Sequence, residues 1–314
     1  MQLRLKQQIV ESYEALALSV VKTPIHTCSQ IDCTFGGRAY LKAEIFQKTG
    51  SFKVRGATNA VREALKRNTA ISSFCTHSSG NFGAALAWAS RQVNKQCYIV
   101  VPENALPNKV AAIRSYNGNI IFCGNQIEDR EFMIEQVIAA HGSSFVHPYD
   151  DDDIILGQAT LAYEFLSESM PLDYLLVPVG GGGLLAGCAL AAHYYFPRTK
   201  VIGVEPINVN DAQISLKTGI RQSVTNGSTI ADGLRTCLGV RNFTIIKDRV
   251  HDIICVQEST IIAALNLLWQ RAKLPVEPSG AVALAGCLEY PDYFKTKSVG
   301  LVLSGGNHNE SYAA

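Results

Sequence analysis

The sequence is poor in charge: only 18% of its 314 residues are Asp, Glu, Lys or Arg, and the formal net charge at pH 7 is +1. Such a balance gives no electrostatic reason to expect nucleic acid or an anionic membrane as a partner. No apolar run reaches the ~20 residues of a membrane-spanning helix, and the first residues lack the zones of a signal peptide. These absences favour a cytoplasmic protein with a small neutral or zwitterionic ligand.

Paired cysteines are also missing. The nine cysteines are an odd number and include no Cys-x-x-Cys pair, which predicts reduced, buried thiols. Hydrophobic residues, in contrast, make up 47% of the chain, enough for a packed globular protein with one large domain or two α/β lobes.

Short apolar or β-branched runs alternate with helix-like stretches. The predicted strands lie at 97–102, 119–124, 174–179, 200–206 and 299–306. The predicted helices lie at 82–92, 130–142 and 184–195, and a further one is capped by Ser259 or Thr260 and carries Ile261, Leu265 and Leu268 on one face. The alternation predicts βαβ units and an α/β fold with mostly parallel sheets flanked by helices.

Ligands of such sheets bind where strands end and helices begin. The strongest candidate is the turn Gly180–Gly183, between a buried strand and an apolar helix. Successive N–H groups without side chains can bind a phosphate there. The spacing fits neither a dinucleotide fingerprint nor a P-loop, which argues against a nicotinamide dehydrogenase. A turn needed only for tight packing is the alternative.

Three further turns carry polar groups. Lys53 lies in KTGSFKVRGA (48–57), where a partly desolvated amine can form an imine with a carbonyl, although a surface lysine is the alternative. The turn Ser78–Asn81 can hold a carboxylate, or Ser79 or Asn81 can simply cap the following helix. Ser304 ends the last predicted strand, where a plain turn is the alternative.

Together, in this order, these turns resemble the serine/threonine dehydratase and serine racemase group of the fold-type II (tryptophan synthase β-like) pyridoxal 5′-phosphate enzymes. The resemblance covers nearly the whole chain. It includes KTGSFKVRGA (48–57), HSSGN (77–81), HPYDD (147–151), GGGGLLAG (180–187), GVEP (203–206), ADGL (231–234), VEPSGA (276–281) and LSGGN (303–307).

The resemblance implies a role for each matching residue. Lys53 forms the imine with the cofactor and takes up the substrate Cα proton, and Gly180–Gly183 bind the cofactor phosphate. Phe52 stacks beside the pyridine ring, Asn81 binds its 3′-oxygen, and Ser304 faces the ring nitrogen. Leu184 and Glu277 complete the cofactor site. Ser78, Ser79, Gly80, Asn81 and Phe82 contact the substrate.

Ser304 favours one type of reaction. A neutral hydroxyl does not keep the ring nitrogen protonated, so a long-lived carbanion is disfavoured and loss of a β-substituent is favoured. We therefore predict a dehydratase (ammonia-lyase) that converts a 3-hydroxy amino acid, such as serine, threonine or a 3-substituted analogue, to a 2-oxo acid and ammonia. Ser79, which matches the second acid–base residue of racemases, leaves an amino acid racemase as the alternative. A non-catalytic binding protein is a third reading, which the joint presence of Lys53, Ser79 and Ser304 disfavours.

Two further features concern substrate specificity and the binding of a metal ion. Phe82 stands where relatives commonly carry histidine, which puts the substrate side chain in doubt, unless the ring only packs against the helix. Glu205, Asp211 and the carbonyl of Val209 match a divalent cation site of this group, for which Mg²⁺, Ca²⁺ or Mn²⁺ are suitable; two solvated carboxylates are the alternative.

The resemblance also implies domains and assembly. We expect a large cofactor-binding domain of residues 1–47 and 151–314, and a small domain of residues 48–150 that closes over the substrate. The acidic turn Asp150–Asp153 is the candidate boundary. A homodimer is expected.

Overall fold

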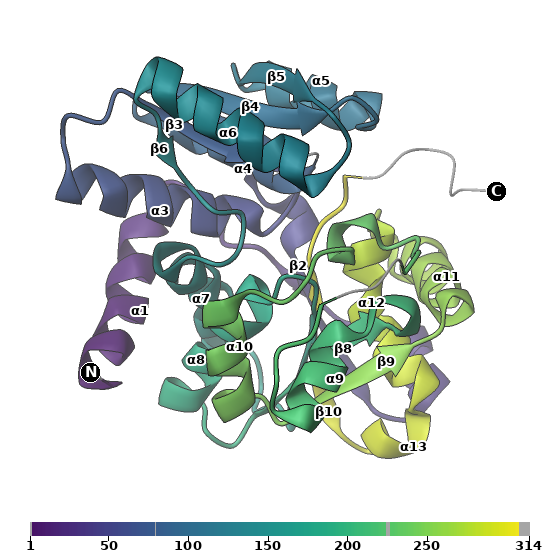
Figure 1. The fold of residues 1–314 in the computed structure, drawn as a ribbon. Coiled ribbons are helices and arrows are strands. Elements are labelled where there is room, and N and C mark those ends of the chain that lie inside the picture. Colours follow the sequence, from purple (N-terminus) through teal and green to yellow (C-terminus); the bar gives the residue numbers. More distant parts are fainter. Residues whose placement is uncertain (1, 79, 224–226, 308–314) are drawn as a thin grey trace.

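Two sheets organise the computed structural model, which describes residues 2–78, 80–223 and 227–307 (Figure 1). The larger sheet has the order β1-β2-β10-β7-β8-β9 and the smaller sheet the order β5-β4-β3-β6. Neighbouring strands run parallel, except for the antiparallel pair β1 and β2. The strands are β1 Ile25–His26, β2 Arg38–Ala43, β3 Ser73–His77, β4 Gln96–Pro102, β5 Asn119–Cys123, β6 Ser144–Phe145, β7 Tyr174–Pro178, β8 Lys200–Pro206, β9 Asp252–Val256 and β10 Ser298–Leu303.

Helices connect most of these strands, and the predicted α/β fold with mostly parallel sheets is confirmed. The α-helices are α1 Gln2–Leu16, α2 Ser29–Phe35, α3 Lys53–Arg67, α4 Asn81–Gln92, α5 Pro107–Ser115, α6 Ile127–His141, α7 Asp152–Glu168, α8 Gly183–Tyr195, α9 Asp211–Thr218, α10 Val240–Arg249, α11 Glu258–Leu267, α12 Pro278–Glu289 and α13 Pro291–Phe294. None of the helices in the described ranges is long and apolar enough to cross a membrane.

The start of α11 corrects one prediction. The helix begins at Glu258, with Gln257 as its N-cap residue, so Ser259 and Thr260 lie inside the first turn. The Thr260 hydroxyl donates to Glu289 on α12 at 2.5 Å instead of capping its own helix. The predicted apolar face is nevertheless correct, since Ile261, Leu265 and Leu268 are all buried.

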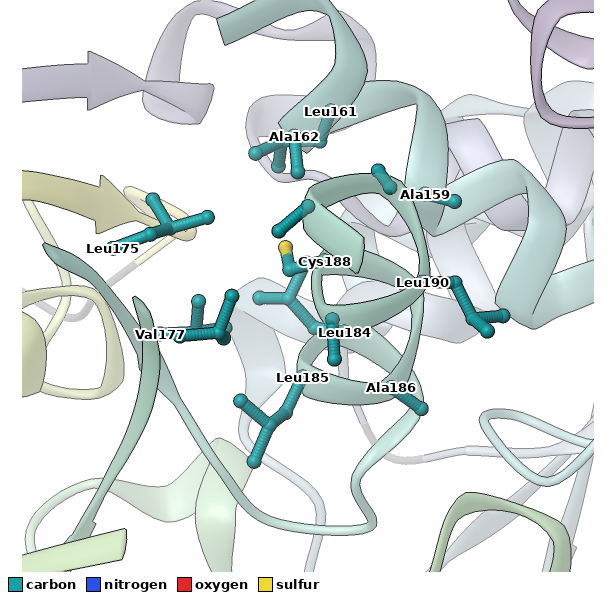
Figure 2. Packing of buried hydrophobic residues seen from close by; sticks show 14 of the residues in the cluster. Ala159, Leu161, Ala162, Leu175, Val177, Leu184, Leu185, Ala186, Cys188 and Leu190 are labelled. Carbon is teal, nitrogen blue, oxygen red and sulfur yellow. The ribbon is translucent and has the colours of Figure 1, made fainter. Parts of the chain in front are cut away.

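Alternate residues of the central strands bury opposite faces of the larger sheet, as the two-residue period of a strand requires. Leu175 and Val177 of β7 point toward α7 and α8, where they pack against Leu185 and Cys188 (Figure 2). Leu176, between them, packs on the other face in the cluster formed with α2, α11 and α12. Helices therefore cover both faces of the sheet.

The smaller sheet lies above the larger one in Figure 1 and is covered in the same way. Phe74 and Ile99 pack against α3 and α4, whereas Cys75 and Val100, the next residues along each strand, pack toward α6. Strands β3–β6 all come from residues 73–145, and all other strands come from outside this range. This separation supports the predicted domains of residues 48–150 and of residues 1–47 with 151–314, which we retain as a proposal.

Helices α3 and α7 join the two layers through backbone contact. A Cβ atom added to Gly157 would lie 2.6 Å from the Gly56 Cα and 2.7 Å from the Arg55 carbonyl oxygen. Only glycine allows this approach, because real Cβ atoms do not come so close to backbone atoms. The contact fixes the start of α3, which begins at Lys53.

A network of four buried charges surrounds this contact. Arg55 donates to Glu44 at 2.8 and 2.9 Å, and to Glu164 at 2.9 and 3.1 Å. Lys42 of β2 donates to Glu164 at 2.6 Å, and Thr23 donates its hydroxyl proton to Glu44 at 2.6 Å. None of the four charged residues is more than 2% exposed. Two positive and two negative charges thus balance inside the protein.

The pKa values of the network follow from this pairing. Burial alone lowers the pKa of Arg55, but the Glu44 and Glu164 carboxylates more than offset this effect and raise it. Burial alone raises the pKa of Glu164, but Arg55 and Lys42 bring it below its ordinary value. Each ion is therefore stable only while its partners are present.

Removal of one partner should be costly. We expect Glu164→Ala to lower the free energy of unfolding by about 3–5 kcal/mol, because Lys42 and Arg55 are left without a counter-charge. Glu168→Ala, on the same helix, breaks the exposed pair with Lys22 and should cost less than about 1 kcal/mol. Urea unfolding of both variants measures the difference, and equal losses would contradict the assigned role of the network.

Candidate active site

The carboxyl ends of β3, β7 and β10 open onto one pocket, as the sequence predicted for the turns that follow strands. Residues from both sheets line it. Those that the sequence analysis selected are Phe52, Lys53, Ser78, Gly80, Asn81, Phe82, Gly180–Gly183, Leu184, Glu277 and Ser304. Ser79 lies outside the described residues, so its predicted acid–base role stays a prediction.

The Lys53 amine lies inside this pocket. Its Nζ donates to the Pro148 carbonyl oxygen at 3.3 Å and lies 5.1 and 5.9 Å from the ring centroids of Phe52 and Phe82. The side chain keeps some exposure through the pocket, yet enough protein surrounds it that burial lowers its pKa to about 8, against a smaller opposing effect of Glu277. A substantial fraction is therefore the neutral, nucleophilic amine near pH 8.

The tetraglycine turn forms one wall at the N-terminus of α8. Gly182 has φ of +88°, which L side chains rarely adopt. A Cβ atom on Gly181 would lie 2.4 Å from the Tyr149 ring. In the described part of the chain, the N–H groups of Gly181, Gly182 and Gly183 make no hydrogen bond to another protein group. They are available for an anion in the pocket.

Asn81 is held by two side chains from distant segments. Its Nδ2 donates to Glu277 Oε1 at 2.8 Å, and its Oδ1 accepts from Asn307 Nδ2 at 3.0 Å. Glu277 is buried, and burial raises its pKa to about 7, although Lys109 partly opposes the shift. Its Oε2 is a buried oxygen without a hydrogen-bond partner in the protein.

Ser78 shapes the turn before α4. Its hydroxyl accepts from the backbone N–H groups of Gly80 at 3.3 Å and Gly83 at 3.1 Å. Gly80 is the N-cap residue and Asn81 the first residue of the helix, so the alternative that Asn81 caps it is wrong. The reason is that the Asn81 amide bonds to Glu277 and Asn307 instead of to its own helix.

Phe82 and Ser304 are both buried at the pocket wall. Phe82 packs in the core cluster of the smaller sheet and also lines the pocket near Lys53, so packing and pocket lining are combined. Ser304 follows β10, and its carbonyl oxygen accepts from the Phe52 N–H at 3.0 Å. This bond ties the lysine-bearing segment to the end of the larger sheet.

The pocket also contains titratable residues that were given no role from the sequence. They are His77, Lys109, Arg130 and Asp232. Lys109 of α5 pairs with Asp232, which comes from the other layer. Arg130 donates from Nη2 to the Asn125 carbonyl oxygen at 3.1 Å, but its Nε is buried without a hydrogen-bond partner, and no salt bridge of Arg130 occurs among the described residues. Burial, with smaller effects of His147 and Arg130, lowers the pKa of His77 to about 4, so its imidazole is neutral at pH 7.

The predicted metal ligands lie elsewhere in the larger layer. Glu205 Oε1 accepts from the Gln213 N–H at 2.7 Å, and Asp211 Oδ2 accepts from the Leu238 N–H at 2.9 Å. Burial is the main reason that the pKa of Glu205 rises to about 8 and that of Asp211 to about 6. The described residues include no group of three or more His, Cys, Asp or Glu side chains arranged for a metal ion.

Comparison with known proteins identifies the class. Residues 16–305 match the family model described as "Pyridoxal-phosphate dependent enzyme". The chain belongs to this family, which confirms the resemblance seen in the sequence. It is therefore similar throughout its length to enzymes that use pyridoxal phosphate.

Individual relatives narrow the comparison. A serine racemase from Dictyostelium discoideum is 40% identical over 96% of this chain and 94% of its own. An L-threo-3-hydroxyaspartate ammonia-lyase from Saccharomyces cerevisiae is 42% identical over 92% of this chain and 88% of its own. The structure of maize serine racemase superposes with a TM-score of 0.94 at 35% identity, covering 98% of this chain and 94% of that one.

The residues of the pocket fit pyridoxal phosphate. A phosphate needs donors without side chains in the way, which the turn Gly180–Gly183 supplies. An aldehyde needs an amine with a lowered pKa, which Lys53 supplies. These two groups line the same pocket.

Proposed function

We propose that this chain is a pyridoxal-phosphate-dependent ammonia-lyase that converts a 3-hydroxy amino acid to a 2-oxo acid and ammonia. The observation that carries the proposal is the Lys53 amine, with a pKa of about 8, in one pocket with the unpaired N–H groups of the tetraglycine turn. Relatives named as ammonia-lyases support the reaction type.

Each wall of the pocket has a proposed role toward the cofactor. Gly180–Gly183, with Leu184 in the first turn of α8, hold the phosphate. Phe52 packs beside the ring, and Ser304 faces the ring nitrogen. Asn81, oriented by Glu277, donates to the ring oxygen. The support is that all these residues line the pocket that contains Lys53.

When bound, the cofactor supplies an electron sink that makes the substrate Cα proton acidic. The neutral Lys53 amine accepts that proton near pH 8, because its pKa matches the task of a general base. The turn Ser78–Asn81 binds the substrate carboxylate through N–H groups at the start of α4. The Lys109–Asp232 pair, which joins the two layers beside the pocket, restricts the entry of water.

Lys53 is the first test. Apo protein mixed with pyridoxal phosphate should develop the absorbance of bound cofactor, and borohydride should leave a pyridoxyl group on Lys53, found by peptide mass spectrometry. The rate at which this absorbance develops should fall about tenfold per pH unit below pH 8, because only the neutral Lys53 amine reacts with the aldehyde. Lys53→Ala should give no adduct at this site.

Product analysis then separates the two candidate reactions. Release of 2-oxo acid and ammonia supports the ammonia-lyase, whereas inversion of the amino acid without ammonia supports a racemase. The racemase is our second candidate, because several relatives carry that name. A wild-type protein with the adduct but neither product would contradict both.

Arg130 suggests which 3-hydroxy amino acid is preferred. A cation at the pocket wall with a buried, unpartnered Nε–H favours an anionic group on the ligand. The neutral His77 beside it is a further donor candidate. A second carboxylate on the substrate, as in 3-hydroxyaspartate, would satisfy Arg130, whereas serine and threonine would not.

We expect Arg130→Met to reduce kcat/KM for 3-hydroxyaspartate by about 10- to 200-fold, the effect of one or two charge-assisted hydrogen bonds. The values for serine and threonine should change less than about threefold. Arg114→Met, the same substitution at an exposed position of α5, is the control. An equal loss for all three substrates would contradict recognition of a second carboxylate.

We also propose that Glu205, Asp211 and the Val209 carbonyl bind Mg²⁺, Ca²⁺ or Mn²⁺. The support is that two buried carboxylates lie in one segment, and carboxylate oxygens are ligands that these hard cations prefer. The ion would stabilise the segment 205–211 and not touch the substrate.

Thermal unfolding tests the metal site. Millimolar Mg²⁺, Ca²⁺ or Mn²⁺ should raise the Tm of the chelator-treated protein by several degrees, because the ion binds the folded state. Glu205→Gln should remove most of that increase, and Glu168→Gln, at a partly exposed position, should not. An equal increase in all three proteins would show that the effect is not specific to this site.

A homodimer, a cytoplasmic location and the closure of residues 48–150 over the substrate are proposals supported by the resemblance to the family and, for the closure, by the two-sheet arrangement.

A further inference from the structure

Asn242 is the buried residue behind the tetraglycine turn that the function described so far does not use. It lies in the first turn of α10 and is completely buried. Its Nδ2 donates to the Gly181 carbonyl oxygen at 2.7 Å and to the Tyr149 carbonyl oxygen at 3.1 Å. Two carbonyl oxygens facing one amide fix its orientation, because the flipped amide would place an oxygen against both.

The backbone around Asn242 is held in turn by Asp150. The Asp150 carboxylate accepts from the N–H groups of Val240 at 3.0 Å, Arg241 at 2.9 Å and Asn242 at 3.3 Å. A carboxylate is favourable at a helix N-terminus. The start of α10 is thus fixed to the residues just before α7, and the Asn242 amide has a defined position.

The peptide bond after Gly181 transmits this position to the pocket. A trans peptide is planar, so its C=O and N–H point in opposite directions. The Gly181 carbonyl oxygen accepts from the Asn242 amide and from the Gly239 N–H at 3.0 Å. Because the carbonyl points toward α10, the Gly182 N–H of the same peptide points away from α10, and Gly182 lines the pocket.

We infer that Asn242 is a positioning residue for the anion-binding turn: its amide holds the Gly181 carbonyl so that the Gly182 N–H faces the cofactor phosphate. This inference rests on the proposed binding of pyridoxal phosphate. Asn242 does not touch the phosphate, and it acts only through the peptide plane. Asn242 also packs directly behind Gly182, since a Cβ atom on Gly182 would lie 3.0 Å from the Asn242 Cβ.

The test distinguishes an effect on binding of the phosphate from an effect on binding of the rest of the cofactor. Apo protein is titrated with pyridoxal phosphate and with pyridoxal, which lacks the phosphate, and both dissociation constants are measured by absorbance. We expect Asn242→Leu to weaken binding of pyridoxal phosphate by roughly tenfold, the effect of about one well-placed hydrogen bond. The constant for pyridoxal should change less than about twofold.

A second variant guards against loss of folding. Asn242→Asp keeps the size of the side chain but places an oxygen against the two carbonyls, so it should weaken the phosphate-containing ligand at least as much. Asn119→Leu, at the exposed start of β5, is the matched control and should bind both ligands as wild type does. The ratio of the two constants does not depend on the folded fraction.

The outcomes are distinct. A phosphate-specific loss in both Asn242 variants supports the inference. An unchanged ratio of the two constants, with wild-type binding intact, overturns it and leaves the proposed function standing. A wild-type protein that binds neither ligand overturns the proposed function itself, and with it the inference.

Discussion

The buried pairing of Arg55 with Glu44 and Glu164 is the constraint on which the geometry of the pocket depends. Arg55 lies two residues after Lys53 at the start of α3. Glu44 follows β2 of the larger sheet, and Glu164 belongs to α7. The guanidinium presents fixed donors to two carboxylates, so it holds α3 at one position relative to both elements. The Lys53 amine is positioned as a consequence.

Opposite charges from the two layers also meet in the pocket itself. Lys109 and Asp232 pair at its wall, while burial gives Glu277 and Lys53 pKa values of about 7 and 8. Both groups therefore change protonation within the range in which most enzymes work. Burial away from water leaves part of the Lys53 amine neutral and nucleophilic, and it leaves part of Glu277 protonated and neutral. One physical cause therefore sets the protonation of both groups.

Site residues that follow strands could be predicted from the sequence, because the carboxyl ends of parallel strands meet at one edge of a sheet. Gly180–Gly183, Ser304 and the turn before α4 could be placed together on that rule. Arg130 could not, since it lies within a helix where an arginine is usually solvated. Asn242 was missed for a similar reason: nothing in the spacing shows that an asparagine in a first helical turn reaches another turn sixty-one residues away.

Helix caps and buried ion pairs also could not be predicted from the sequence. Thr260 looks like a cap residue, yet its hydroxyl bonds to Glu289 of α12, a partner that only the tertiary structure provides. The pairing of Lys42 with Glu164 spans 122 residues. Local patterns cannot reveal such partners, because the bonds depend on packing between elements that are distant in the sequence.

The contact of Gly56 with Gly157 has a mechanical consequence. The backbones of α3 and α7 meet directly there, because a Cβ atom on Gly157 would lie 2.6 Å from the Gly56 Cα, and so close an approach leaves little freedom to slide. If the smaller sheet tilts against the larger one about this contact, residues close to the contact move little and residues far from it move most. The Lys53 amine would then keep its distance from the glycine turn. The outer wall of the pocket, which carries Arg130, would move further and so set the width of the pocket opening.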